Sequence, residues 1–193
     1  MRRAAPLLFL CLWPLPAAAG AISSAYTSFD IKHCKVLDAA NPAEEWGGSW
    51  LCAGYGGLKV YVAEGDLREM LAYGRNPRKH CAATQSFSAF NSAFPTIEWR
   101  LDAGKPFAVI QRFSVSRPDD SDKSETWLAV TRLEDGNSCR AAVIKGSMPK
   151  ANALARQAAD QSRGFDCLRD EARIISPDPG GQAVISGTPC AAE

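Results

Sequence analysis

The stretch LKVYVAEGDLREMLAY, residues Leu58–Tyr73, decides the fold of this chain. Its first part, Leu58–Ala63, is rich in β-branched and aromatic residues, which is typical of a β-strand. In Asp66–Tyr73 apolar and polar residues alternate, which favours a strand over a helical turn. Gly65 between the two parts suits a tight turn. The stretch therefore predicts a β-hairpin.

Further strand patterns lie on both sides of this hairpin, most of them bounded by turn residues. Between them, Asn76–Pro95 is polar and rich in Ser and Ala, and we expect a long loop there. The turn Pro118–Lys123 is expected to join two strands. The expected strands are Tyr26–Leu37, one starting at Trp50–Cys52, Thr96–Leu101, Pro106–Arg117, Glu125–Glu134 and Ser138–Lys145.

One helix is expected, over Lys150–Arg163, with an alanine-rich stripe at helical spacing. Ser147 is placed to cap its start and Gly164 to end it. Strands first and a helix last favour the α+β class. We expect a mainly antiparallel sheet of six or seven strands, with the C-terminal helix packed on it and disulfides holding the domain.

The N-terminus has the parts of a secretory signal peptide: basic Arg2 and Arg3, the apolar run Pro6–Pro16, and the small residues Ala17–Ala21. We expect residues 1–21 to be removed on export, 22–175 to form a single domain, and 176–193 to be a polar tail pinned by Cys190. The apolar run is too short to span a bilayer. The sequence thus predicts a periplasmic or secreted protein without a transmembrane segment.

Six of the seven cysteines lie beyond this leader, and an even number indicates disulfides in an oxidising compartment. Six cysteines allow fifteen connectivities, which sequence alone does not separate. One pair would close a hairpin folded at residues 42–43, a second would join a strand to the end of the following helix, and the third remains by elimination. The favoured pairs are Cys34–Cys52, Cys139–Cys167 and Cys81–Cys190. Their wide spacing speaks against a zinc site, so no metal is expected.

The charge balance excludes some classes of partner. The chain has 22 basic and 21 acidic residues and a formal net charge of +1, with no basic block. Such a chain lacks the electrostatic footprint of a nucleic-acid-binding protein.

Aromatic residues give a candidate binding surface. Trp46, Trp50 and Tyr55 are interleaved with glycines, a composition with which loops present contact area, and aromatics are enriched at recognition hot spots. The alternative is that Trp50 packs on the Cys34–Cys52 bridge and Tyr55 fills the edge of the core. With Arg68, these three are the candidate binding residues.

Carboxylates give the enzymatic alternative. Glu64, Asp66 and Glu69 cluster around the predicted hairpin turn. Paired carboxylates can hydrolyse glycosides when they are about 5–9 Å apart, although charges beside a turn are usually a solvated face. The two histidines, His33 and His80, are neighbours of cysteines, and the sequence contains no nucleotide-binding or serine-hydrolase motif. We expect no cofactor.

Two resemblances follow from these residues. Gly48–Gly74 together with Asn152–Cys167 (NALARQAADQSRGFDC) resembles a family of small exported bacterial proteins with no assigned activity. More loosely, Cys52–Val62 (CAGYGGLKVYV) is similar to the cysteine–glycine stretch that leads into a β-rich run in periplasmic lysozyme inhibitors. That resemblance implies a small antiparallel β domain with a disulfide. The Ser-Gly loop with which the inhibitors enter the lysozyme cleft is not evident, since Ser186–Gly187 lies in the tail.

The sequence favours a non-enzymatic binding or inhibitor module that contacts an envelope protein or a cell-wall component. The alternatives are a small hydrolase that uses Glu64 or Asp66, and a structural assembly protein.

Overall fold

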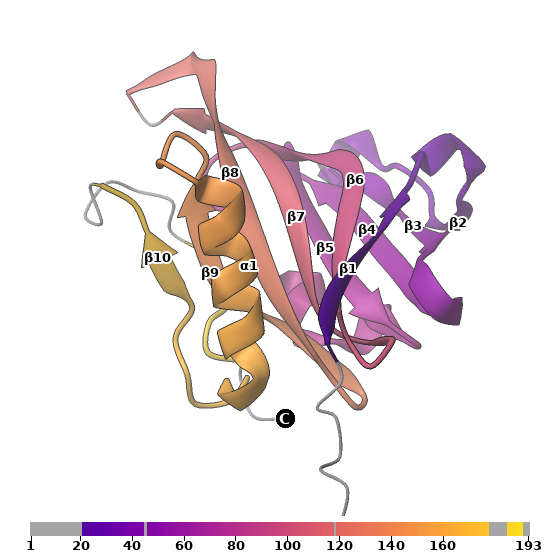
Figure 1. The fold of residues 1–193 in the computed structure, drawn as a ribbon. Helices are drawn as coiled ribbons and strands as arrows, with labels where there is room; N and C mark the ends of the chain where they lie inside the picture. The colour runs from indigo at the N-terminus through magenta and orange to yellow at the C-terminus, as the bar shows by residue number, and fades with distance from the viewer. Residues whose placement is uncertain (1–20, 45, 118, 178–184, 191–193) are drawn as a thin grey trace, which may run out of the picture.

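The computed structural model describes residues 21–44, 46–117, 119–177 and 185–190. Within these residues ten strands form one mixed sheet, and helix α1 (Ala151–Gln161) covers part of one face (Figure 1). The proposed leader lies outside the described residues except for Ala21. In chain order the strands are β1 Ile22–Ser28, β2 Lys35–Asp38, β3 Trp46–Ala53, β4 Lys59–Gly65, β5 Arg68–Gly74, β6 Asn91–Asp102, β7 Lys105–Arg117, β8 Asp120–Glu134, β9 Asn137–Lys145 and β10 Arg173–Ile175.

The expectation of an α+β fold with one C-terminal helix is confirmed. The expectation of six or seven antiparallel strands was wrong, since the described sheet has ten strands and is mixed. The sheet runs β10-β9-β8-β7-β6-β5-β4-β3-β2, and β1 pairs with β6 beside this path. Two of the pairings are parallel, β5 with β6 and β9 with β10. The sequence patterns missed these because one parallel contact is a single bridge and the other spans three residues.

The hairpin predicted from residues 58–73 is confirmed. β4 and β5 pair antiparallel from Lys59↔Gly74 to Gly65↔Arg68. The two turn residues, Asp66 and Leu67, both have positive φ (49° and 57°), as the tightest hairpin turns require. Leu67 therefore lies in the turn and is exposed, and the strand begins at Arg68, two residues later than expected.

Several other segment boundaries differ from those expected, and the strand expected to start at Trp50–Cys52 already begins at Trp46. Tyr26–Leu37 is split between β1 and β2, because the side chain of Asp30 accepts a hydrogen bond from the Lys32 amide and starts a short 3₁₀ turn. Asn91–Pro95 belongs to β6 and not to the loop. The proline is tolerated because the β6–β7 pairing is irregular between Ala93 and Ile97. β8 already begins at Asp120, within the expected turn.

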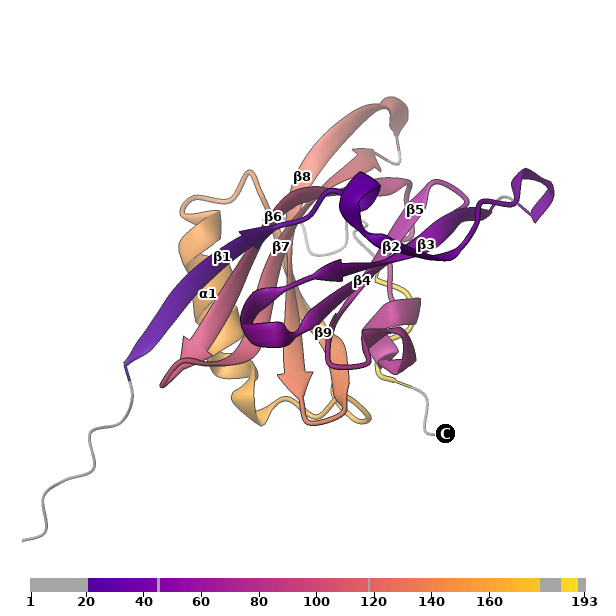
Figure 2. The same ribbon diagram turned by 90° about the vertical axis from the view of Figure 1, so that its right-hand side faces the viewer.

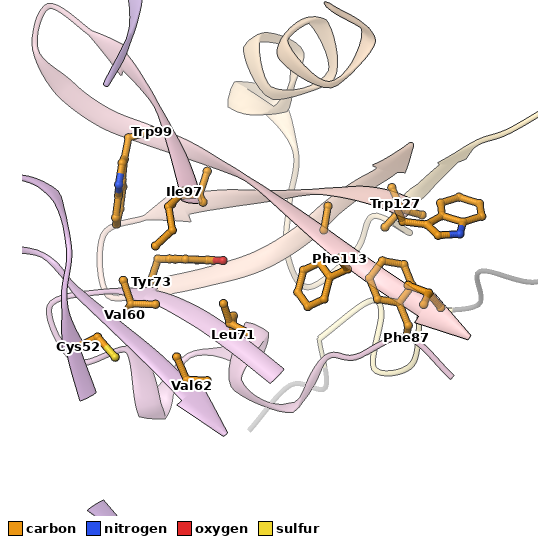
Figure 3. Close-up of a cluster of buried hydrophobic side chains, with 14 of the residues drawn as sticks. Cys52, Val60, Val62, Leu71, Tyr73, Phe87, Ile97, Trp99, Phe113 and Trp127 are labelled. Atoms are coloured by element: carbon orange, nitrogen blue, oxygen red, sulfur yellow. The ribbon is translucent and has the colours of Figure 1, made fainter. Parts of the chain in front are cut away.

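The sheet changes direction between β5 and β6. These strands meet at one bridge, Arg68↔Asn91, and from Thr96 onward the same edge of β6 pairs with β1 instead. As a result β5 lies against β8 and β9, and the β2–β5 half faces the β6–β9 half (Figure 2). The main core fills the space between the halves, where side chains from β4 and β5 point toward those from β6 and β7 (Figure 3). Its largest members are Trp99, Trp127, Tyr73, Phe87 and Phe113.

Helix α1 packs on the outer face of the sheet through buried alanines, which contact Ala142 and Ile144 of β9. Two arginine–carboxylate pairs hold it to β6: Arg100 donates to Asp160 at 2.9 and 2.8 Å, and Arg156 to Glu98 at 2.7 Å. The expected cap at Ser147 was wrong. The helix begins only at Ala151, after two successive turns that are closed by the bonds from Met148 N to Lys145 O and from Ala151 N to Met148 O. Lys150 takes the N-cap position, and its side chain makes no capping bond.

Three disulfides join different parts of the chain, and they are the three pairs favoured by the sequence: Cys34–Cys52, Cys81–Cys190 and Cys139–Cys167. The described end of the tail is attached to the domain by more than its cysteine. The Ser186 amide donates to Ser86 O at 3.0 Å, and Ile185 forms a β-bridge with Phe87. None of the described helices has the length and apolar character needed to cross a membrane.

Candidate functional site

A cavity of about 950 Å³ opens at one end of the two sheet halves, and we call it the end cavity. Its volume lies in the range of about 300–1,000 Å³ that small-molecule sites occupy. It is enclosed by the β3–β4 connection, the end of β5, the turn at residues 77–79 and the β6–β7 and β8–β9 turns, all in the lower half of Figure 2. The residues lining it include Gly56, Leu58, Tyr73, Gly74, Arg75, Asn76, Lys79, His80, Lys105, Pro106, Leu133, Glu134, Asp135 and Gly136.

The mouth of the end cavity carries an excess of positive charge. Arg75, Lys79 and Lys105 are exposed, and none of them has an ion pair with another described residue. Of the two acidic residues in the lining, Glu134 is already paired with Arg132, at 3.1 Å, which leaves Asp135. A cleft lined by one sign of charge attracts ligands of the opposite sign.

His80 forms part of the inner wall and is held rigidly. Its Nδ1 lies 3.1 Å from Tyr73 O and 3.1 Å from Ser138 Oγ. Because a carbonyl only accepts, Nδ1 is the donor to Tyr73 and Nε2 is left as the acceptor nitrogen. Burial lowers the pKa of His80, which keeps the ring neutral. A Cβ on Gly74 would lie 2.4 Å from the imidazole, so glycine is needed there for the ring to pack.

The groups around His80 suit binding better than nucleophilic catalysis. Ser138 is completely buried, so a substrate has no access to its hydroxyl. The Tyr73 hydroxyl lies 3.5 Å from Gln111 Oε1, and burial raises its pKa, so it stays protonated. The wall therefore combines the fixed imidazole of His80 with the apolar side chains of Leu58, Pro106 and Leu133.

A second cavity, of about 310 Å³, lies at the tip of the β4–β5 hairpin, and we call it the hairpin cavity. Glu64 and Glu69 face each other directly across the two strands. Burial raises the pKa of Glu69; the bond from the Ala93 amide (2.6 Å) opposes this, and the neighbouring Glu64 adds to it. The lining comprises Glu64, Leu67, Glu69, Phe90, Asn91, Ser92, Ser114 and Ser116.

Because its pKa is raised in the folded protein, ionised Glu69 disfavours folding. This cost is absent below the pKa of the unfolded chain and grows as the pH rises through the folded pKa. We therefore expect Glu69→Gln, which can keep the bond from Ala93, to raise the free energy of unfolding by about 0.2–1 kcal/mol above that pKa. Urea unfolding between pH 4 and pH 8 measures it, with the exposed Glu44→Gln as control. A variant less stable than wild type at pH 8 would contradict the assignment.

The hairpin brings together the acidic residues singled out in the sequence, but one of them, Asp66, is already engaged in an ion pair. Asp66 is paired with Arg68, and Arg68 also donates to Ser88 O at 2.9 Å and lies 5.1 Å over the Phe90 ring. Arg68 is therefore held between the hairpin turn and the segment that precedes β6. The carboxylate that lies opposite Glu64 is therefore Glu69, and not Asp66.

The aromatic residues proposed for binding lie mostly at the edge of the core. Trp50 and Tyr55 are half-buried and pack on the main core, with the Tyr55 ring 6.4 Å from that of Trp99. Trp46 begins β3, and its side chain lies outside the described part of the structure. The glycine-rich stretch contributes Gly56 to the end cavity instead.

The cations of the end cavity were missed by sequence reasoning. Arg75, Lys79 and Lys105 stand in segments expected to be loops or turns, 30 residues apart at most, and nothing in the local pattern marks them as neighbours. Of the two histidines, His33 is exposed and lies away from the end cavity lining, with its Nδ1 3.3 Å from Asp30 Oδ2.

The resemblances to a family of small exported proteins and to lysozyme inhibitors remain predictions from the sequence. Ser186–Gly187, the one Ser-Gly pair considered for an inhibitor loop, is used in attaching the tail, since Gln85 Nε2 donates to Gly187 O at 2.8 Å. Comparison of the chain with models of protein families, with curated proteins and with solved structures gives no match.

Proposed function

We propose that this protein is a non-enzymatic binding module exported to the cell envelope, and that the end cavity takes an anionic ligand of small-molecule size. The observation that carries this proposal is a set of three cations, Arg75, Lys79 and Lys105, that have no ion pair with any described residue and lie around a cavity of about 950 Å³. The three disulfides support an oxidising compartment outside the cytoplasm.

The chemistry of the cavity defines the ligand class. The exposed cations attract a carboxylate or phosphate group, because the three of them outnumber Asp135, the one acidic residue of the described lining that has no ion pair with a described residue. Leu58, Pro106 and Leu133 offer apolar surface for the body of the ligand. Cell-envelope fragments that combine an anionic group with an uncharged body fit this description.

Calorimetric titration at low salt tests the proposal with three probes: a disaccharide-tetrapeptide from peptidoglycan, dodecyl phosphate, and uncharged maltotriose. We expect one of the anionic probes to bind with 1:1 stoichiometry and maltotriose not to bind. The double variant Lys79→Glu/Lys105→Glu should weaken binding about tenfold or more, because it reverses two of the three cations. The matched control Lys32→Glu/Lys150→Glu reverses two exposed cations elsewhere and should leave the affinity unchanged. Equal weakening by both double variants, or no preference for an anionic probe, would overturn the proposal.

A second candidate, hydrolysis of a glycan in the hairpin cavity, is favoured by the opposed pair Glu64 and Glu69 and by the raised pKa of Glu69. A carboxyl group that holds its proton is the usual general acid of such enzymes. Release of reducing sugar ends from peptidoglycan that is lost in Glu69→Gln, with the affinity of the end cavity unchanged, would establish this activity. No release by the wild-type protein would exclude it for that substrate.

A further inference from the structure

Two of the disulfides meet at one point of the molecule. Cys139 of β9 is bonded to Cys167, and Cys81 is bonded to Cys190 near the C-terminus. The Sγ atoms of Cys139, Cys167 and Cys190 all lie within 4.8 Å of one another. The Cys190 sulfur therefore belongs to one disulfide and lies beside the other.

Only one of these four cysteines is open to solvent. Cys139, Cys167 and Cys190 are 1%, 2% and 7% exposed, whereas Cys81 is half-buried at the start of a 3₁₀ turn. Cys81 is therefore the most exposed residue of the four, while the body of the protein shields the three others. Since exchange requires access to the attacked sulfur, Cys81 is the position at which it begins.

Cys190 is held beside the second disulfide by contacts that do not depend on its own sulfur. Its amide donates to Cys167 O at 2.8 Å. The tail before it is attached by the bond from Ser186 N to Ser86 O, at 3.0 Å, and by that from Gln85 Nε2 to Gly187 O, at 2.8 Å. On the other side, the Cys81 amide donates to Asn137 Oδ1 at 3.0 Å. When the Cys81–Cys190 bond opens, the Cys190 thiolate stays within reach of Cys167.

We propose that the Cys81–Cys190 disulfide is a thiol-reactive site that passes exchange on to the buried Cys139–Cys167 disulfide. An external thiolate attacks Sγ of Cys81, forms a mixed disulfide with it, and releases Cys190 as a thiolate. The Cys190 thiolate then attacks Sγ of Cys167, forms a Cys167–Cys190 disulfide and releases Cys139 as a thiolate. If the external reagent is a dithiol, its second thiolate displaces Cys81. The reagent is then oxidised by two electrons, and Cys81 and Cys139 are left as thiols.

The variant Cys81→Ser isolates the second step, because it leaves Cys190 as a free thiol beside the Cys139–Cys167 disulfide. After incubation at pH 8, acid quenching, alkylation and peptide mapping should find a Cys167–Cys190 disulfide and alkylated Cys139 in roughly a tenth of the molecules or more. The matched control is Cys34→Ser, which leaves Cys52 free outside this cluster and should keep both remaining disulfides. Intact Cys139–Cys167 in all Cys81→Ser molecules, or equal rearrangement in the control, would overturn the proposal.

A second measurement on the wild-type protein covers the case in which Cys81→Ser does not fold, as judged by circular dichroism. Treatment with one equivalent of reduced glutathione should place the adduct on Cys81 and join Cys190 to Cys167. An adduct on Cys34 or Cys52 instead, or an adduct on Cys81 with Cys190 left as a free thiol, would contradict the proposed route.

Discussion

Trp99→Ala is expected to lower the free energy of unfolding by about 3–5 kcal/mol, the range for truncating a buried large aromatic residue. Trp99 is fully buried on β6 and belongs to the core between the sheet halves (Figure 3). Its ring meets Tyr73 of the opposite half edge-on, with centroids 5.8 Å apart, and its Nε1 donates to Thr27 Oγ1 of β1 at 2.8 Å. The substitution thus removes a contact between the halves and a bond that holds β1.

Such a loss is a large part of the about 5–15 kcal/mol that keeps a typical domain folded. Denaturant unfolding followed by circular dichroism measures it. The control is Tyr26→Ala, an aromatic residue on the paired strand β1 that is 56% exposed, and it should cost less than about 1 kcal/mol. Equal costs for the two variants would show that Trp99 does not join the sheet halves.

Removal of the Cys81–Cys190 disulfide, as Cys81→Ser/Cys190→Ser, is expected to cost about 4.7 kcal/mol, the most of the three disulfides. This disulfide closes a sequence separation of 109 residues, against 28 for Cys139–Cys167 and 18 for Cys34–Cys52. In the chain-entropy model the stabilisation grows with the closed loop, from about 3 kcal/mol for 15 residues to about 4.7 kcal/mol for 100. The tail keeps its main-chain bonds to Ser86 and Cys167, so the folded state is expected to change little.

Double serine variants of each pair leave no unpaired thiol, so exchange between disulfides does not complicate the comparison. Guanidinium unfolding should rank them in the order of their loop lengths, with Cys34→Ser/Cys52→Ser costing about 3 kcal/mol. If that pair proved the most costly, strain or lost packing in the folded state would outweigh the entropy of the unfolded chain.

Features that depend on neighbouring residues could be predicted from the sequence. The β4–β5 hairpin follows from alternation on both sides of a turn, and α1 from apolar residues at helical spacing. The Cys34–Cys52 and Cys139–Cys167 disulfides each close a short loop, so local geometry was enough to favour them. The clustering of Glu64 and Glu69 likewise follows from the hairpin itself.

Features that depend on how the sheet halves meet could not be predicted. Trp50 and Trp99 both lie on strands and both pack on the main core, yet Trp50 is half-buried and Trp99 is fully buried. Trp99 lies on β6, in the middle of the strand order, and contacts Tyr73 of the opposite half, whereas Trp50 lies on β3, one strand from the end of that order. Arg140 lies in the expected strand Ser138–Lys145, and nothing in the local sequence marks it as buried. It is 1% exposed, lies over the Phe113 ring and donates to Thr131, with no carboxylate among its described ion-pair partners.

The sequence by itself determined most of the strands, the helix and a disulfide framework, because these depend on periodicity, on composition and on short loops. The tertiary structure alone decided which charged residues gather around the end cavity. Arg75, Lys79 and Lys105 meet around the end cavity only because the sheet bends at the single Arg68↔Asn91 bridge and brings the ends of distant strands together. Contacts of that kind join residues far apart in the chain, and no local pattern records them.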